Sequence, residues 1–148
     1  MKKRKKKNAG FTLIEILVVV VIIAILGGFV GINVINKPND AKVVKAKSQI
    51  GVFETALKLY KMDNGNYPTQ EQGLFALVEA PTVEPVPNKY SLDGYLDKSK
   101  VPSDPWGSEY IYLIPGSNGE RFEIISYGSD RQPGGEEYDT DISSSNID

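Results

Sequence analysis

The sequence contains no cysteine and no histidine among its 148 residues. The absence of cysteine excludes disulfide bonds, thiolate nucleophiles and cysteine-ligated zinc sites. The absence of histidine removes the commonest general base and the commonest ligand of transition metals. Because nothing in the sequence supplies a nucleophile with a base, we expect a protein that is not an enzyme. Carboxylate chemistry and the binding of a hard cation remain open.

Acidic residues are absent from the first ten positions, which hold six of the 17 basic residues. All 19 acidic residues follow Gly10, so the rest of the chain has 11 basic against 19 acidic residues, a formal charge of −8. Nucleic-acid phosphates are bound by clustered lysine and arginine side chains. The only such cluster is the N-terminal run Lys2–Lys7, so we expect no nucleic-acid partner. The length suits one compact domain with one appended segment.

The next segment, Phe11–Val30, is apolar and contains a single charged residue, Glu15. A helix of this length is about 30 Å long, the thickness of the hydrocarbon core of a bilayer. We therefore expect a transmembrane helix over residues 11–32. The preceding basic residues favour a cytoplasmic N-terminus, which places residues 33–148 on the other side. A cleaved signal peptide has a shorter apolar region, and a plain signal anchor leaves the charge of Glu15 unexplained.

The residues around this charge resemble a known signature. Gly10-Phe11-Thr12-Leu13-Ile14-Glu15, after a basic stretch and before an apolar helix, resembles the type IV prepilin motif. The resemblance implies that residues 1–10 are a leader, which a prepilin peptidase cuts between Gly10 and Phe11, and that Phe11 is then N-methylated. It also implies that residues 11–32 form a filament core in which Glu15 acts in assembly. The carboxylate of Glu15 could pair there with the α-amino group of a neighbouring subunit's Phe11, in a dry environment that tolerates neither charge alone.

A second helix is predicted after this segment. Apolar residues recur at spacings of three and four, at Val43, Ala46, Ile50, Phe53, Leu57 and Tyr60. We expect this stripe to pack on a sheet, with Asn39 or Asp40 capping the helix and Asn64-Gly65 ending it. We expect the opposite face to be wet because of its charged residues, Lys42, Lys45, Lys47, Glu54 and Lys58.

The rest of the chain predicts a small antiparallel sheet. Residues 109–114 and 121–127 are rich in Tyr and Ile and flank a turn at 115–120, which predicts a hairpin. Asp104-Pro105-Trp106-Gly107 predicts a type I turn with Trp106 as an apolar cover. A short amphipathic stretch is expected at 74–79. The predicted fold class is α+β and type IV pilin-like, with a long N-terminal helix, membrane-spanning in its first half, packed on the sheet.

Further motifs extend the resemblance over almost the whole chain. Tyr67-Pro68-Thr69, Glu71-Gln72-Gly73-Leu74, Gly94-Tyr95-Leu96 and the Asp104–Gly107 turn are together similar to the major pseudopilins of type II secretion. The resemblance implies a single-pass inner-membrane protein with a periplasmic domain. It implies that copies polymerise into a pseudopilus that drives export of folded proteins across the outer membrane. The other partners it implies are a prepilin peptidase, minor pseudopilins and the inner-membrane assembly platform.

The C-terminal segment, residues 126–142, is rich in glycine and in carboxylates, which suit a hard cation such as Ca²⁺. The segment lacks the EF-hand spacing, and the residues alone favour an acidic, solvated tail. The resemblance instead implies a structural calcium loop. In that loop Asp130 and Asp141 are the carboxylate ligands, Tyr127 offers a carbonyl, and Asp139 is an alternative ligand. Arg131 departs from the family pattern at this point.

Two other functions remain open at this level. The first is a type IV pilin of adhesion, motility or DNA uptake, for which a C-terminal cysteine pair would be expected. The second is a membrane-anchored domain that binds calcium or hydrolyses a substrate. The clustered carboxylates of this chain lie in a glycine-rich tail and not in a predicted pocket, which disfavours catalysis.

Overall fold

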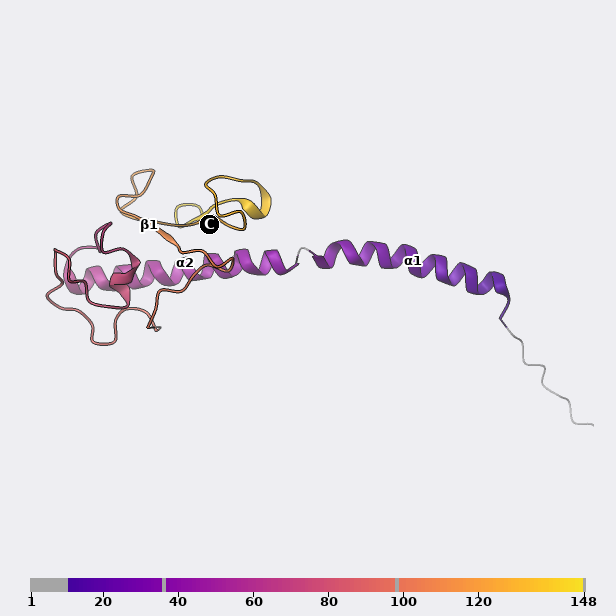
Figure 1. The fold of residues 1–148 in the computed structure, drawn as a ribbon, viewed down its shortest axis with the longest axis horizontal. Coiled ribbons are helices and arrows are strands. Elements are labelled where there is room, and N and C mark those ends of the chain that lie inside the picture. Colours follow the sequence, from indigo (N-terminus) through magenta and orange to yellow (C-terminus); the bar gives the residue numbers. More distant parts are fainter. Residues whose placement is uncertain (1–10, 36, 98, 148) are drawn as a thin grey trace, which may run out of the picture. The chain divides into compact units, whose positions relative to one another are not determined.

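The computed structural model describes residues 11–35, 37–97 and 99–147, without the side chains of residues 28–37 and 138. The chain divides into two compact units, Met1–Pro38 and Asn39–Asp148. We call them the N-terminal unit and the globular unit. The N-terminal unit contains helix α1, Leu13–Ile35, which continues through Gly27 without a break (Figure 1). A helix was expected here from the apolar sequence.

Helix α2 extends over Lys37–Asn64 and is the long axis of the globular unit (Figure 1). The prediction that Asn39 or Asp40 caps this helix is wrong, because the helix starts before both residues. Proline is well accommodated in a first turn, where its missing N–H costs no hydrogen bond, and Pro38 lies in the first turn of α2. The predicted end is confirmed. Gly65, with φ of 84°, donates its N–H to the Lys61 carbonyl at 2.8 Å.

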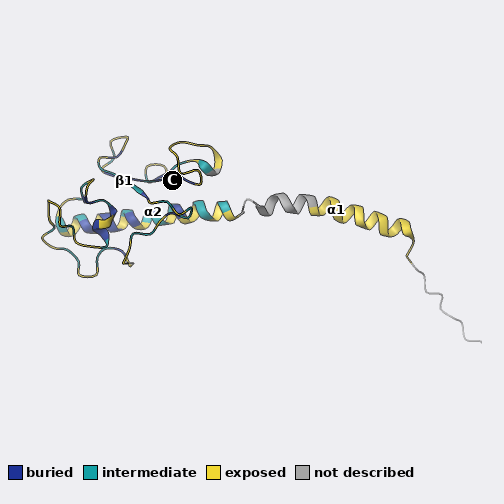
Figure 2. Ribbon diagram, viewed as in Figure 1, coloured by how far each residue is buried: buried dark blue, intermediate teal, exposed yellow. Residues whose placement is uncertain are grey.

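The apolar stripe of α2 forms one wall of the core, as predicted. Its buried residues recur at helical spacing, and none is more than 3% exposed: Ala46, Ile50, Phe53, Ala56, Leu57 and Tyr60. Figure 2 shows the buried side of this helix within the globular unit. Burial of these side chains is the main contribution of α2 to stability, since apolar area removed from water contributes about 25 cal/mol per Å².

The opposite face of α2 follows the prediction in part, since Lys45 and Lys58 are exposed. Lys42, Lys47 and Glu54 are half-buried and flank the core stripe. The most exposed line of the helix is uncharged and partly apolar, with Val44 66%, Val52 48%, Leu59 46% and Met62 79% exposed. A step of 100° per residue explains the difference, because it places residues 44, 55 and 62 directly opposite the stripe and the lysines to its sides. The face expected to be wet therefore carries no charge along its crest.

Three short strands form one antiparallel sheet in the order β1-β2-β3, namely Ile111–Leu113, Glu123–Ser126 and Ile142–Ser143. Tyr112 is opposite Ile124, and Ser126 is opposite Ile142. The predicted hairpin is confirmed as β1 and β2. The sequence did not indicate β3, which has two residues only. Two 3₁₀ turns complete the fold, Leu74–Leu77 within the expected amphipathic stretch and Glu137–Asp139 before β3.

Aromatic contacts join the sheet to α2. Phe53 of α2 meets Tyr110, next to β1, edge to face at 5.1 Å between ring centroids. Tyr112 of β1 is buried and donates its hydroxyl to the Pro68 carbonyl at 2.9 Å. Burial raises the pKa of Tyr112 far above its ordinary value, so this hydroxyl stays neutral and remains a donor. The helix and the sheet therefore share a single core.

The expected turn at Asp104–Gly107 is confirmed and is tied to the sheet. The Gly107 N–H donates to the Asp104 carbonyl at 3.0 Å, and Gly107 has φ of 89°. The buried Asp104 carboxylate accepts from the N–H groups of Trp106 at 3.0 Å and Ser108 at 2.8 Å. Its second oxygen accepts from the Ser126 hydroxyl at 2.6 Å. One carboxylate thus closes the turn and fixes it to β2.

A second buried carboxylate, Glu123 of β2, closes the other end of the sheet. It accepts from the Ser117 N–H at 2.9 Å, the Ser143 hydroxyl at 2.5 Å and the Ser145 hydroxyl at 3.2 Å. These hydrogen bonds, with Ser117 the largest cause, hold the pKa of Glu123 at about 2, against an ordinary value of 4.5. The ionised form is therefore favoured in the folded state, and it joins the hairpin turn to β3.

Replacing Glu123 by Gln should destabilise the globular unit and flatten its acid response. Hydrogen bonds to a charged group contribute about 2 kcal/mol, so we expect a loss of about that size at neutral pH. A lowered folded-state pKa stabilises fully above pH 4.5, and this contribution is lost as the pH falls towards 2. Urea unfolding at several pH values measures both effects.

Glu109→Gln is the matched control, because this side chain is exposed and lies just before β1. The control should still lose stability steeply between pH 4.5 and 2, as the unaltered unit does. The Glu123→Gln variant should lack this steep fall. If the free energy of unfolding depends on pH with the same slope in the two variants, the assigned role of Glu123 is contradicted.

Candidate functional site

The first candidate site lies at the start of α1. Gly10, the predicted cleavage residue, lies outside the described residues. Phe11 is 84% exposed. The Glu15 carboxylate accepts from the Thr12 N–H at 2.7 Å and the Thr12 hydroxyl at 2.8 Å, and the Glu15 N–H donates to the Thr12 hydroxyl at 3.3 Å. This reciprocal pattern is a capping box, in which one acidic side chain satisfies donors that a helix start leaves free.

The structure therefore gives Glu15 a partner within its own chain. The sequence predicted a pairing with a neighbouring subunit and missed the local one. The signal was present as a threonine three residues before a glutamate at the start of an apolar run. Two hydrogen bonds to one carboxylate oxygen reduce the cost of placing Glu15 among apolar residues.

The described side chains of α1 are mostly apolar and exposed. Its large apolar side chains from Phe11 to Leu26 are between 48% and 84% exposed. A helix that is apolar around its whole circumference normally lies inside a protein or a membrane. Over the part of the chain that the structure describes, no helix reaches both the length and the hydropathy needed to cross a bilayer.

The second candidate site is the loop between β2 and β3. Tyr127 directly follows β2 and is half-buried. Asp130 is exposed, and its carboxylate accepts from the Gln132 N–H at 3.0 Å within its own turn. Asp139 ends the 3₁₀ turn and accepts a hydrogen bond from the Ser129 hydroxyl. Asp141 directly precedes β3, and one of its oxygens accepts from the Gly134 N–H at 2.9 Å.

These contacts fold the two halves of the loop onto each other. Ser129 meets Asp139, and Gly134 meets Asp141. Gly135 has φ of 91°, and a Cβ there would collide with the Asp139 carbonyl, so the close approach requires glycine. The second Asp141 oxygen is buried and has no hydrogen-bond partner. Among the described residues, however, no three acidic side chains gather closely enough to hold a metal ion.

A contact that the sequence did not indicate joins this loop to the Asp104–Gly107 turn. Arg131, with φ of 62°, donates from its guanidinium to the Trp106 carbonyl at 3.0 Å. A non-glycine residue in this backbone region is uncommon and costs on the order of 1 kcal/mol. The hydrogen bond offsets part of this cost and holds the tip of the loop against the turn.

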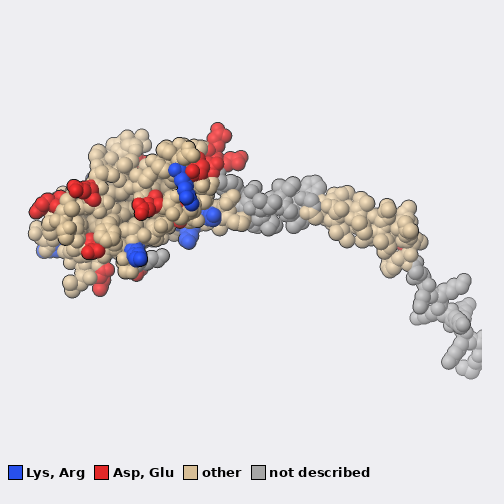
Figure 3. Space-filling view, viewed as in Figure 1, with Lys and Arg blue, Asp and Glu red and all other residues tan. Residues whose placement is uncertain are grey.

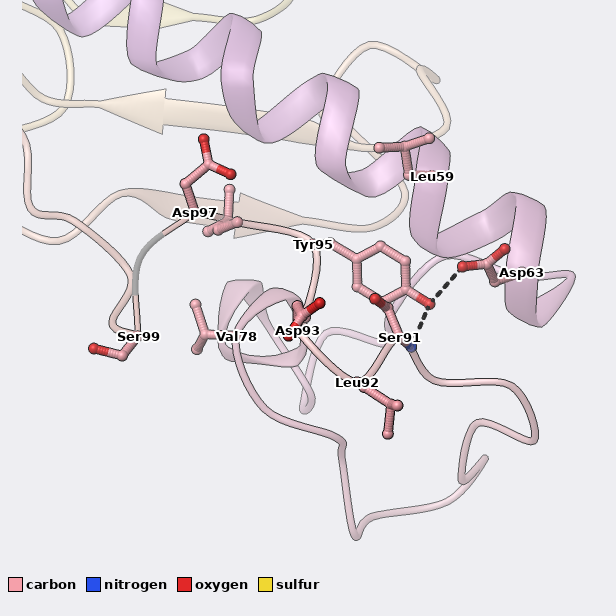
Figure 4. A pocket seen from close by; sticks show the side chains of 11 residues that line it. Leu59, Asp63, Val78, Ser91, Leu92, Asp93, Tyr95, Asp97 and Ser99 are labelled. Atoms are coloured by element: carbon pink, nitrogen blue, oxygen red, sulfur yellow. Dashed lines mark hydrogen bonds between the residues drawn. The ribbon is translucent and has the colours of Figure 1, made fainter.

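A polar cavity of about 680 Å³ lies beside the C-terminal part of α2 (Figure 4). Tyr95 donates its hydroxyl to the Asp63 carboxylate at 3.0 Å, and the Ser91 N–H donates to the same hydroxyl at 3.4 Å. Asp93 and Asp97 also line the cavity. No motif in the sequence indicated this cavity. The contact between Tyr95 and Asp63 fixes this segment to the end of α2, and the geometry assigns the lining residues no chemical step.

Comparison with known proteins places these features in a family. The family model described as type II secretion system (T2SS), protein G, matches residues 33–145, and a prokaryotic N-terminal methylation motif matches residues 5–31. The chain is 48% identical over 139 residues to the type II secretion system core protein G of Pseudomonas aeruginosa, covering 94% of this chain and 96% of that protein. It is 45% identical over 145 residues to the protein of the same name from Vibrio cholerae, covering 98% and 97%.

Among solved structures, the chain is similar to the major pseudopilin from the type 2 secretion system of enterohaemorrhagic Escherichia coli. The TM-score is 0.64 at 40% identity, and the match covers 76% of this chain and 93% of that one. An apolar N-terminal helix with this motif, followed by a helix packed on a small antiparallel sheet, defines a pilin-like protein. The chain belongs to the protein G family of type II secretion systems, the family of the major pseudopilin. The predicted fold class and family are confirmed.

Proposed function

We propose that the chain is the major structural subunit of a type II secretion pseudopilus. A prepilin peptidase removes residues 1–10, and Phe11 is then N-methylated. Residues 11–32 cross the inner membrane with the globular unit in the periplasm, until copies leave the membrane and polymerise through this helix. Together with minor pseudopilins and the inner-membrane assembly platform, the growing filament pushes folded proteins through the outer membrane.

The observation that supports this proposal most directly is the uncovered apolar surface of α1, with Glu15 at its start. Water cannot be its permanent environment, because each exposed apolar side chain of this size costs about 1.5–3 kcal/mol relative to burial. A bilayer and the interior of a filament both cover such a surface. The methylation motif over residues 5–31 supports the same maturation step.

The uncharged crest of α2 supports polymerisation from the globular unit. A groove of about 310 Å³ runs between this crest and the segment 95–97. Its lining residues are Ser48, Gly51, Val52, Thr55, Ala56 and Leu59 of α2, with Tyr95, Leu96 and Asp97 on the other side. Small residues along a helix permit close approach of a second backbone, and the exposed Val52 and Leu59 give that contact apolar area. We propose that neighbouring copies cover this groove in the filament.

Maturation is tested by mass spectrometry of the chain expressed with a prepilin peptidase. We expect the loss of residues 1–10 and one added methyl group on the new N-terminal Phe11. The Glu15→Gln variant should be processed in the same way and yet fail to form filaments, because the neutral amide cannot pair with the amino group of a second copy. An intact N-terminus, or normal filaments from this variant, would contradict the proposed assembly.

Val52→Glu tests the crest of α2. We expect filament formation in secreting cells to fall at least tenfold, because a carboxylate would be buried between copies without a partner. The stability of the globular unit should change by no more than about 0.5 kcal/mol, since the side chain is on the surface. Val86→Glu is the matched control, because Val86 has a similar exposure, 46%, and lies outside α2. If both variants form filaments equally well, the groove is not an interface.

We propose further that the loop of residues 126–142 binds a structural Ca²⁺ ion. The support is the buried, unpartnered oxygen of Asp141, beside a backbone that Gly134 and Gly135 turn sharply. Asp141 and the Tyr127 carbonyl would hold the ion, with Asp130 and Asp139 as the other candidate ligands. Calcium accepts six to eight oxygens, so carbonyls and water would supply the remainder. The ion would neutralise the carboxylates of the loop and stabilise its fold, which no disulfide bond can do in a chain without cysteine.

Thermal unfolding of the globular unit, with calcium and with a chelator, tests this site. At a calcium concentration a hundredfold above Kd, binding adds about 2.7 kcal/mol, which raises the midpoint by roughly 10 °C for a unit of this size. Asp141→Asn should abolish the shift while still accepting from the Gly134 N–H. Glu136→Gln, which removes an exposed carboxylate of the same loop, should keep it. If calcium does not raise the unfolding midpoint of the unaltered unit, the proposal that this loop binds calcium is wrong.

A further inference from the structure

Strand β1 forms one edge of the sheet, because the strand order is β1-β2-β3. It lies within Tyr110–Ile114, a run of aromatic and branched aliphatic residues without a charge or a proline. An edge strand offers N–H and C=O groups to any further strand, and runs of this composition are those through which proteins pair incorrectly and aggregate. The outer edge of β1 therefore needs protection.

The register of the sheet shows which backbone groups of β1 face outward. In an antiparallel pair, alternate residues direct both of their backbone groups to the same neighbour. The Ser144 N–H donates to the Ile124 carbonyl at 2.9 Å, so Ile124 of β2 points towards β3. Tyr112 is opposite Ile124 and therefore points away from β2. By the same alternation, Ile114 points outward as well.

Gln70 occupies these outward groups. Its side-chain Nε2 donates to the Tyr112 carbonyl at 2.6 Å, and the Ile114 N–H donates to its Oε1 at 3.0 Å. One residue of a parallel neighbouring strand would make the same two hydrogen bonds. The backbone around Gln70 is held in a turn, in which the Gly73 N–H donates to the Thr69 carbonyl at 3.0 Å. The amide of Gln70 thus takes the place of an added strand.

The opposite edge of the sheet is closed in the same manner by Asn146. Because the Ser144 N–H points to β2, the preceding residue of β3, Ser143, points outward. The Ser143 N–H donates to the Asn146 Oδ1 at 3.1 Å, and the Ser143 carbonyl accepts from the Asn146 N–H at 3.0 Å. Gln70 and Asn146 lie on different segments, and each occupies outward backbone groups at one edge of the sheet.

Repulsion between copies does not replace this protection. Residues 39–148 contain 10 basic and 18 acidic residues, so two globular units repel each other at a distance. Figure 3 shows acidic side chains at several places on the visible face of this unit. At physiological salt, however, the repulsion decays over about 8 Å. Neither β1 nor β3 contains a charged residue, so charge does not protect the strand edges themselves.

We propose that Gln70 and Asn146 guard the two edges of the sheet and prevent a second copy of the chain from pairing with it. The β1 edge is self-complementary, because a two-fold axis at Tyr112 would place this residue opposite its counterpart and Tyr110 opposite Ile114. The guard acts in a single copy. Its benefit rests on the proposed polymerisation, in which copies lie close together and must associate through their helices and not through their strands.

The test uses the full-length chain in detergent, with micelles in excess over protein. Gln70→Leu keeps a side chain of similar size and removes both hydrogen bonds. At low protein concentration, we expect the Ile114 amide to exchange its hydrogen about tenfold faster, the factor that corresponds to the loss of one hydrogen bond. At higher concentration this variant should form dimers, which sedimentation velocity detects, and the dimers should protect Ile114 again.

Asn146→Leu tests the other edge. It should speed the exchange of the Ser143 amide by about the same factor and leave Ile114 unchanged. An unchanged rate at Ser143 would show that Asn146 does not protect β3.

Gln132→Leu is the matched control, because Gln132 is an exposed glutamine in a different loop. It should sediment like the unaltered chain at every concentration. The amides of Phe53 and Leu57, which lie in the buried stripe of α2, should stay protected in all variants and so report that the globular unit is folded. If Gln70→Leu does not fold, Gln70→Glu decides, since its carboxylate accepts from Ile114 but cannot donate to Tyr112. It should also form dimers.

Three results would overturn the guard. Equal dimer formation by Gln132→Leu would attribute the association to added apolar area. Dimers in which Ile114 still exchanges fast would place the contact on another surface. A folded Gln70 variant that stays monomeric at all concentrations would show that Gln70 only fastens its turn to β1. None of these measurements involves filament formation, so each result leaves the proposed polymerisation untouched.

Discussion

The apolar surface of α1 is the constraint on which the other features depend. The described large apolar side chains from Phe11 to Leu26 are exposed, and under the proposed function lipid or other copies cover them. Lipid and the interior of a filament accommodate leucine and isoleucine side chains about equally well. They differ greatly in how they accommodate the Glu15 carboxylate. The capping contact with Thr12 satisfies the carboxylate in a single copy, and a neighbouring amino group would satisfy it in a filament. In the proposed assembly, Glu15 would exchange its contact with Thr12 for one with the neighbouring amino group as the subunit leaves the membrane.

The globular unit meets a different problem, because it has a small sheet and no disulfide. Two buried carboxylates compensate. Asp104 joins its turn to β2 through Ser126, and Glu123 joins the hairpin turn to β3 through Ser143. Each is satisfied by several donors, which is the condition under which a buried charge stabilises a fold. Both act between segments far apart in sequence and so perform part of the role of a disulfide.

The main elements were predictable from sequence because their patterns are local and periodic. Contacts between segments far apart in the sequence were not predictable. The stripe from Val43 to Tyr60 and the hairpin around residues 115–120 are local patterns, so they were found. The start of α2 was misplaced because Asn39 and Asp40 are residues typical of a helix cap, whereas Pro38 before them already lies in the first turn. β3 has two residues and exists only because β2 is beside it. The uncharged crest of α2 was missed because charges on the flanks were assigned to the opposite face.

The candidate calcium loop shows the same limit. Sequence located the acidic residues, but which oxygens converge depends on how Arg131 and Ser126 attach the loop to the Asp104–Gly107 turn. That attachment divides the loop. Residues up to Arg131 are held to the core by hydrogen bonds that need no cation, whereas the later half depends on contacts of Asp139 and Asp141 with exposed backbone and a serine. Repulsion among the carboxylates therefore acts mainly on the later half, and a bound cation would order that half and leave the first almost unchanged.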